Sequence, residues 1–260
     1  QAKSLGGKWL LRIEDIDPPR EQQGAAAAIL TSLEAHGLYW DETPLYQSQQ
    51  HELYNDILSD LVKQGEAYYC TCTRKMIKTL GGYYQGHCSQ LNNSAQDAAL
   101  RLKNETPVRH FVDEIQGDVD IDSQLAEEDY IIHRRDGLYA YQLAVVADDI
   151  AQGITQVVRG CDLLIPTARQ IHLFEQLNHT VPSYAHVPLA VTKPGFKLSK
   201  QNKATPLNDK TPVKNLVDAL TFLGQMPPDA LNQEDLQEVI TWATAHWQLN
   251  RVPKTSEVMV

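Results

Sequence analysis

Two lysines, Lys197 and Lys200, stand three residues apart in the segment PGFKLSKQ, residues 194–201. Proline and glycine oppose helix formation there, so the segment is predicted to be a loop. Ammonium groups on such a loop can neutralise the charge that grows on a polyphosphate as a phosphate bond breaks. A solvated basic turn is the commoner interpretation of two lysines alone. The choice between the two depends on the rest of the chain.

A carboxylate, Glu14, stands at the end of the apolar run 8–14, which has the pattern of a central strand in a parallel sheet. Open α/β sheets place their ligands at the carboxyl ends of their strands. Glu14 could therefore bind a substrate ammonium group. The alternative is a local ion pair with Arg12 or Arg20.

A second strand end offers an arginine. Arg159 closes the apolar run 154–158 and precedes Gly160. A guanidinium group can bind a carboxylate or a phosphate through two parallel hydrogen bonds. The alternative is an ion pair with Asp148 or Asp149.

Three of the four cysteines, Cys70, Cys72 and Cys88, fall within 19 residues. Three soft sulfur ligands suit zinc better than a hard cation, and the spacing is not that of a disulfide framework. The fourth ligand stays open between His87, which adjoins a cysteine, and Tyr84, four residues before it. Buried or free thiols without a metal are the alternative.

Strand-like and helix-like segments alternate along much of the chain, which favours an α/β fold with a doubly wound parallel sheet. The expected helices cover residues 21–37, 50–63, 166–177, 212–223 and 234–247, and the expected strands cover 8–14, 67–72, 98–103, 108–112, 154–158 and 184–191.

Residues 67–129 interrupt this alternation and predict a mixed α+β insertion carrying the cysteines. The chain is therefore divided into residues 1–66, the first half of a nucleotide-binding α/β domain; 67–129, the inserted zinc-binding subdomain; 130–192, the second half; and 193–260, the lysine loop with a helical C-terminal region. Residues 251–260 are expected to form a loose tail.

The composition excludes some functions. With 260 residues, 42% hydrophobic residues and a net charge of −10, the chain can bury a core but cannot bind nucleic acid or anionic membrane through bulk attraction. No apolar run is long enough to cross a membrane, and residues 1–4 lack the charged-then-apolar order of a signal peptide, so a cytoplasmic location is expected. The remaining cysteine, Cys161, is interpreted as a small buried residue. Alternate aspartates at 118, 120 and 122 lack the glycine and glutamate of a calcium loop and indicate a solvated face.

Taken in order, several motifs resemble the catalytic core of the class I glutamyl-tRNA synthetases, a Rossmann-like fold. They are RIEDIDPPR, YQS, CTC with YYQGHC, IIHRRDGLYAYQLAVVADD, QVVRGCDLL and KLSKQ, and the resemblance runs from residue 8 to about 224. More narrowly, the chain is similar to the paralogues that glutamylate queuosine in tRNA(Asp) and lack an anticodon-binding domain. The clues are the short C-terminal part, the cysteine cluster, glutamine after Lys200 in place of arginine, and Val145 in place of asparagine.

The resemblance implies an ATP-dependent ligase that forms glutamyl-adenylate from L-glutamate without tRNA and then transfers glutamate to queuosine. Lys200, with help from Lys197, is the implied catalytic group that stabilises the ATP phosphates, and Ser199 belongs to the same ATP-binding loop. Mg²⁺ is expected with ATP. Glu14 is implied to bind the substrate ammonium, and Tyr141 and Arg159 to complete the glutamate pocket.

The resemblance also implies a structural zinc site. Its ligands would be Cys70, Cys72, Tyr84 and Cys88. Contact with tRNA(Asp) is expected on a local basic surface, for which Arg134, Arg135 and Lys203 are candidates, and a monomer is expected.

The HIGH-like motif of this family does not occur in these 260 residues. We therefore expect the first strand and helix of the domain to lie upstream, and the 260-residue chain alone to be inactive and marginally folded. Two alternative functions stay open: a shortened glutamyl-tRNA synthetase that charges tRNA(Glu), and a non-catalytic, zinc-containing RNA-binding module.

Overall fold

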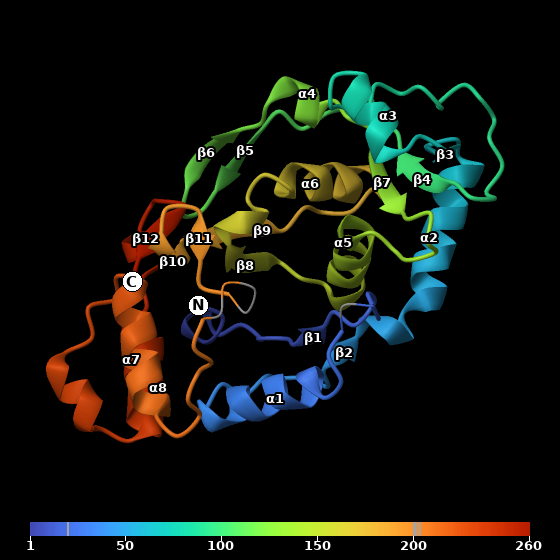
Figure 1. The fold of residues 1–260 in the computed structure, drawn as a ribbon. Helices are drawn as coiled ribbons and strands as arrows, with labels where there is room; N and C mark the ends of the chain where they lie inside the picture. Colours follow the sequence, from blue (N-terminus) through green and yellow to red (C-terminus); the bar gives the residue numbers. More distant parts are fainter. Residues whose placement is uncertain (20, 200–201, 203) are drawn as a thin grey trace.

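Two pairs of parallel strands, each joined through a helix, form the α/β part of the protein (Figure 1). The computed structural model describes residues 1–19, 21–199, 202 and 204–260. The first unit consists of β1 (Arg12–Ile13), α1 (Ala25–Ala35) and β2 (Leu45–Tyr46), and the second of β8 (Gln156–Gly160), α6 (Thr167–Gln176) and β9 (Ser183–Val187). The predicted α/β class with parallel strands is thus confirmed.

The predicted central strand over residues 8–14 is shorter than expected, because only two of its residues form a regular ladder. Residues before it pair irregularly: the backbone N–H of Asp41 donates to the carbonyl of Trp9, and the Asp41 side chain accepts from the Trp9 N–H at 2.7 Å. The run of apolar residues therefore predicted a strand in the right place but made it too long.

The predicted insertion, residues 67–129, contributes two strands to an antiparallel sheet and forms a separate hairpin; the third strand of the sheet, β7 (Tyr130–His133), lies just beyond the predicted boundary. The sheet has the order β3-β4-β7, with β3 (Ala67–Cys70) and β4 (Ala99–Leu102) as the two strands from the insertion. The hairpin pairs β5 (His110–Asp113) with β6 (Gly117–Asp120). The short helices α3 (Arg74–Thr79) and α4 (Ser123–Ala126) complete this region.

The main core lies where this antiparallel sheet meets α2 (His51–Lys63) and α5 (Tyr141–Gln152). Figure 1 shows α5 beside α6 in the middle of the molecule, and the two helices are in contact. Seven consecutive residues of α5, from 143 to 149, are buried, and the last two are aspartates. The core therefore extends to the edge of a charged site.

All five predicted helices are present, and only the start of α1 differs by more than two residues from its predicted position. At the C-terminus, α7 (Pro212–Phe222) packs against α8 (Leu236–His246). Their shared core contains Val217, Leu220 and Val239. In the described part of the chain, no helix is long and apolar enough to cross a membrane.

The predicted strand over residues 184–191 is two strands in the structure. The first, β9, ends before Pro188, and β10 (Leu189–Lys193) follows it. Proline has no backbone N–H to donate to a ladder, so the strand breaks there. Next, β11 (Phe196–Lys197) turns back to pair antiparallel with β10.

The prediction of a loose tail over residues 251–260 is wrong. Strand β12 (Glu257–Met259) pairs parallel with β10, and the Glu257 carboxylate accepts from the backbone N–H of Gly195 at 3.1 Å. Val252 is buried with Ile115 and Ala185. These partners are distant in sequence, so local periodicity gave no sign of them.

Candidate active site

A cavity of about 370 Å³ opens between the end of β1, the start of α5 and the end of β8. Its wall contains Glu14, Tyr141 and Arg159, the three side chains predicted to bind glutamate. The volume falls within the usual range for small-ligand sites. It is also lined by residues that the sequence did not single out as ligand-binding: Arg12, Val145, Asp149, Val157, Val158 and Leu163.

One side of the cavity carries a cluster of charges. Arg12 Nη1 donates to Asp149 Oδ1 at 2.7 Å, and Arg12 Nε lies 3.7 Å from Asp148 Oδ2. Arg12 is thus paired with α5, which leaves Glu14 available to a ligand. Although the Glu14 side chain is exposed to the cavity, the surrounding protein desolvates its carboxyl group and raises its pKa; Arg12 opposes this rise, and Asp148 and Asp149 add to it. In an extended chain, residues 12 and 14 lie on one face. This two-residue period could have predicted that Arg12 lines the cavity together with Glu14.

The fully buried carboxylate of Asp148 supports this cluster. It accepts hydrogen bonds from Gln47 Nε2 at 2.8 Å and from the Tyr54 hydroxyl at 2.9 Å. Burial raises the pKa of Asp148, while these donors and Arg12 oppose the rise. Because a buried charge is costly unless paired, these bonds keep Asp148 available to hold Arg12 at the cavity.

Arg159, on β8, lines the same cavity. Its Nη2 donates to Thr167 Oγ1 at 2.7 Å, and its Nη1 lies 3.4 Å from the Tyr141 hydroxyl oxygen. The proposed ion pair of Arg159 with Asp148 or Asp149 does not account for its position, because Arg12 holds both aspartates. The cavity is therefore lined by both an anionic side chain, Glu14, and a cationic one, Arg159, and the two charges interact.

The described part of the lysine loop lies close to the same end of β8. Lys197 Nζ pairs with Asp162 Oδ2 at 2.6 Å, and both side chains are exposed. Ser199 Oγ accepts from the backbone N–H of Asn202 at 3.3 Å. An exposed ion pair is worth at most about 1 kcal/mol, so a phosphate can replace Asp162 as the partner of Lys197. Lys200 and Lys203, for which roles were also predicted, lie outside the described residues.

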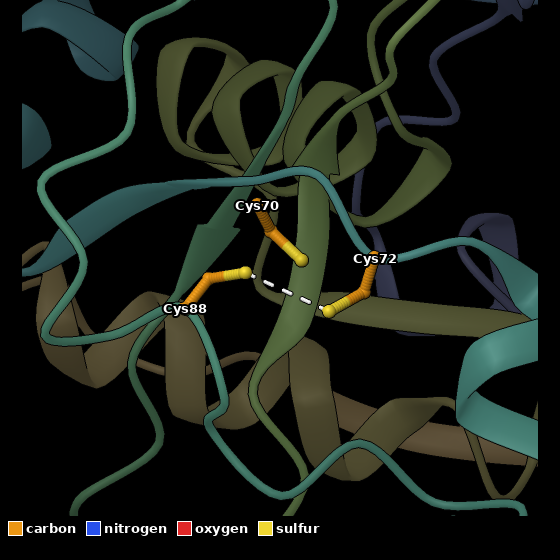
Figure 2. A group of neighbouring side chains, drawn as sticks. All are labelled: Cys70, Cys72 and Cys88. Atoms are coloured by element: carbon orange, nitrogen blue, oxygen red, sulfur yellow. Dashed lines mark hydrogen bonds between the residues drawn. The ribbon is translucent and has the colours of Figure 1, made fainter.

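The three cysteines of the insertion converge on one point (Figure 2). Cys70 and Cys72 come from the end of β3, and Cys88 from the loop between α3 and β4. Their sulfur atoms lie within 4.8 Å of one another, and the Cys72 and Cys88 sulfurs are 3.6 Å apart. Zinc–sulfur bonds of about 2.3 Å in a tetrahedron place the sulfurs about 3.8 Å apart. The spacing thus fits zinc, and all three thiols are free of disulfide bonds.

The two candidates for a fourth ligand, Tyr84 and His87, differ in burial. Tyr84 is buried, and its hydroxyl oxygen accepts from the backbone N–H of Cys88 at 2.8 Å. His87 is exposed and takes no part in the cluster of possible metal ligands found among the described residues. Burial opposes ionisation of Cys88, but hydrogen bonds from the Thr71 backbone and from neighbouring side chains lower its pKa to about 7. The structure thus brings together three sulfurs, with the buried Tyr84 hydroxyl beside Cys88.

Arg134 and Arg135, two of the three residues predicted to contact tRNA, already have partners within the protein. Arg134 pairs with Asp136 and lies 3.6 Å from Asp17, and Arg135 donates to the carbonyl of Thr71 at 2.6 Å. Arg135 therefore also holds the loop between two cysteines. Three further basic side chains, which the sequence analysis did not select, are exposed on α3: Arg74, Lys75 and Lys78.

Cysteine 161 and the alternating aspartates have ordinary structural roles. Cys161 is half-buried rather than buried, and burial raises the pKa of its thiol to about 11. Asp118 and Asp120 are exposed beside His110, and Asp122 caps α4 through the backbone N–H of Leu125. The interpretation of these aspartates as a solvated face agrees with their exposure.

The fold is that of a class I tRNA synthetase catalytic domain. The crystal structure of a glutamate tRNA ligase from Elizabethkingia meningosepticum in complex with its amino acid superposes with a TM-score of 0.79 at 22% identity, and covers 99% of this chain and 61% of that one. A glutamate-tRNA synthetase from Elizabethkingia anophelis gives the same TM-score, and the superposition covers 100% of this chain and 62% of that one. This chain thus spans about three fifths of each.

The chain belongs to the family of class I tRNA synthetases (E and Q), catalytic domain, whose model matches residues 1–255. It is similar to the glutamyl-Q tRNA(Asp) synthetase of Colwellia psychrerythraea, with 57% identity over 259 residues, 98% of this chain and 82% of the relative. It is also similar to the protein of the same name from Photobacterium profundum, with 54% identity over 260 residues, 100% of this chain and 84% of the relative.

Proposed function

We propose that this protein is an ATP-dependent ligase that activates L-glutamate without tRNA and transfers it to the queuosine base in the anticodon loop of tRNA(Asp). The names of relatives more than 50% identical over nearly the whole chain support this function. The observation that carries it is that Glu14, Arg159 and Tyr141 line one cavity of 370 Å³. A site with both a carboxylate and a guanidinium group is complementary to an amino acid, which carries both charges.

In the first reaction, Glu14 would hold the substrate ammonium and Arg159 a substrate carboxylate. A glutamate carboxylate oxygen attacks the α-phosphorus of ATP in line, the bond to the β-phosphate oxygen breaks, and pyrophosphate leaves. Lys197 exchanges Asp162 for a phosphate oxygen and, together with Lys200, stabilises the departing charge. Mg²⁺, bound with ATP, would neutralise further phosphate charge.

In the second reaction, a hydroxyl oxygen of the queuosine ring attacks the carbonyl carbon of glutamyl-adenylate. The new ester bond forms as AMP leaves, and the hydroxyl proton is lost to solvent or to the leaving phosphate. Arg134, Arg135 and Lys203 remain the proposed tRNA contacts. An acidic protein needs such a local basic surface to approach RNA.

Cys70, Cys72, Tyr84 and Cys88 would hold a structural zinc ion. The sulfur spacing fits this metal, and the Tyr84 hydroxyl interacts with the side chains of Cys70 and Cys88. Three sulfurs and a phenol complete four-coordination, so the ion would link the end of β3 to the loop before β4 and leave no position for a reacting water. A cytoplasmic location and a monomeric state remain predictions.

The test is glutamate-dependent exchange of pyrophosphate into ATP, followed by transfer of labelled glutamate to tRNA. Both are measured on the protein expressed from its complete reading frame. We expect exchange without tRNA, and labelling of queuosine-containing tRNA(Asp) but not of the same tRNA without queuosine. Exchange that requires tRNA(Glu) would favour the shortened glutamyl-tRNA synthetase instead. RNA binding with no exchange at all would favour the non-catalytic module.

A further inference from the structure

A buried chain of hydrogen bonds joins the inserted hairpin to the glutamate pocket. Asp113 is the last residue of β5, His186 lies on β9, and Arg159 lies opposite His186 on β8, where the two residues are paired in register. Asp113 is 1% exposed and His186 is fully buried. The path therefore runs from the insertion, through the parallel strand pair, to a cavity wall.

Each contact in this chain is short. The His186 Nδ1 lies 2.6 Å from Asp113 Oδ2, and the His186 Nε2 lies 3.1 Å from Arg159 Nε. The other Asp113 oxygen, Oδ1, accepts from three backbone N–H groups, those of His186, Ile115 and Gln116, at 2.9–3.1 Å. Burial favours the neutral acid, but these bonds outweigh it and lower the pKa of Asp113 below its ordinary value.

These partners assign the tautomer of His186. An ionised carboxylate only accepts and a guanidinium group only donates, so Nδ1 must carry the proton and Nε2 must present its lone pair to Arg159. The Thr167 hydroxyl oxygen also lies 3.2 Å from His186 Nε2, but it accepts from Arg159 Nη2 at 2.7 Å and donates its proton to the carbonyl of Leu163 at 2.8 Å, which leaves the Nε2 lone pair to Arg159. One edge of the guanidinium group is thus bound to the protein, while Nη1 lies toward Tyr141.

We propose that Asp113 and His186 are positioning residues that fix the tautomer of the imidazole and, through it, orient the Arg159 guanidinium for the substrate carboxylate. This inference rests on the proposed function of the pocket. A free arginine side chain has many rotamers, and restricting them before the ligand arrives improves binding. The inserted hairpin would then contribute to the glutamate pocket without touching glutamate.

The hairpin is well anchored for such a role. The backbone N–H of Glu114 donates to the carbonyl of Tyr184 at 2.8 Å, and Gln116 Nε2 donates to the carbonyl of His186 at 2.8 Å. Phe111 of β5 belongs to the same buried cluster as Ile171 of α6. Asp113 is therefore held rigidly relative to β9.

The sharpest variant is Asp113→Asn. Its side-chain oxygen can keep the three backbone hydrogen bonds, while its NH₂ group replaces the oxygen that faces His186. The imidazole must then accept at Nδ1 and carry its proton on Nε2, directly against the Arg159 N–H. We expect the KM for glutamate to rise roughly ten-fold or more, with a smaller change in kcat and an unchanged KM for ATP. Asp120→Asn, an exposed change beside His110 on the same hairpin, is the matched control and should behave as wild type.

A double-mutant cycle separates positioning from general destabilisation. In a His186→Gln background, the glutamine carbonyl can accept from Arg159 whatever occupies position 113. Asp113→Asn should therefore cost much less there than in the wild type. Equal costs in the two backgrounds would overturn the inference. Thermal unfolding of each variant shows whether the fold is intact.

Two measurements that need no catalysis complete the test. Nitrogen NMR of the His186 imidazole should show the Nδ1–H tautomer, and finding the proton on Nε2 would overturn the proposal. Calorimetry should show weaker glutamate binding by Asp113→Asn than by the wild type. If the wild type binds no glutamate, the proposed function fails and the inference fails with it. If the wild type and Asp113→Asn bind glutamate equally, only the inference fails.

Discussion

At the residue scale, the pocket consists of charges whose partners come from distant parts of the chain. Arg12 and Asp149, which form an ion pair at the cavity, are 137 residues apart. Because Arg12 satisfies Asp148 and Asp149, Glu14 and Arg159 are left to face the ligand. The substrate charges would thus be matched by two side chains of opposite sign.

The pH dependence of glutamate use should report on Glu14. Desolvation raises its pKa, so the carboxylate needed to bind an ammonium group is lost on acidification at a higher pH than for an ordinary glutamate. We expect kcat/KM for glutamate to fall with decreasing pH. Glu14→Gln should lower kcat/KM by roughly ten-fold or more and flatten this limb. Pyrophosphate exchange across the pH range measures both effects.

For this pH test, Glu21→Gln, an exposed change nearby, is the control. A Glu14→Gln profile with the wild-type limb would show that another group titrates.

At the element scale, the C-terminal segment supports the strand that leads into the lysine loop. Strand β12 pairs with β10, and the turn after α7 packs tightly against Arg251 and Pro253, which precede β12. A Cβ at Gly224 would overlap the carbonyl oxygen of Arg251. The segment after α8 is thus tied to β10 by a strand pair and to the turn after α7 by close packing.

Two glycine substitutions test this packing. Gly224 and Gly153 have nearly equal positive φ angles, 70° and 64°, but a Cβ at Gly153 meets nothing within 4 Å. Both changes to alanine introduce the same backbone strain, of about 1 kcal/mol. Gly224→Ala should lower the free energy of unfolding by about 1–3 kcal/mol more than Gly153→Ala, because it also overpacks the contact with Arg251. Denaturant unfolding measures the difference. Equal losses of unfolding free energy in the two variants would mean that Arg251 moves away from the new Cβ without destabilising the protein.

The proposed zinc site also acts at this scale, since it would fix the segment between β3 and β4. We expect the purified protein to contain about one zinc per chain, and a chelator or Cys72→Ser to remove it and lower the Tm. Cys161→Ser serves as the control because this cysteine lies outside the cluster. Elemental analysis and thermal unfolding provide the readouts. Full zinc content in Cys72→Ser would exclude this ligand set.

At the scale of the whole molecule, a net charge of −10 opposes RNA binding, so any tRNA contact must depend on a few basic side chains. The double change Arg134→Gln and Arg135→Gln should weaken tRNA(Asp) binding. It should also reduce the slope of log affinity against log salt concentration by about 1–2, one for each lost phosphate contact. Arg109→Gln on the inserted hairpin, exposed and paired with Glu127, is the control. An unchanged slope, measured by filter binding across salt concentrations, would place the tRNA elsewhere, with α3 the next surface to test.

The sequence by itself determined the helices, the parallel α/β class, the cysteine cluster and three pocket residues. Helical periodicity and strand ends are local properties. Glu14 and Arg159 stand at predicted strand ends, and Tyr141 was implied by the resemblance of a short motif to the family. Only the tertiary structure decided that Arg12 pairs with α5, that residues 257–259 form a strand, and that Asp113 reaches Arg159 through His186. Each of these contacts joins residues far apart in sequence. Their partners are set by how the packed elements meet, which a local pattern does not record.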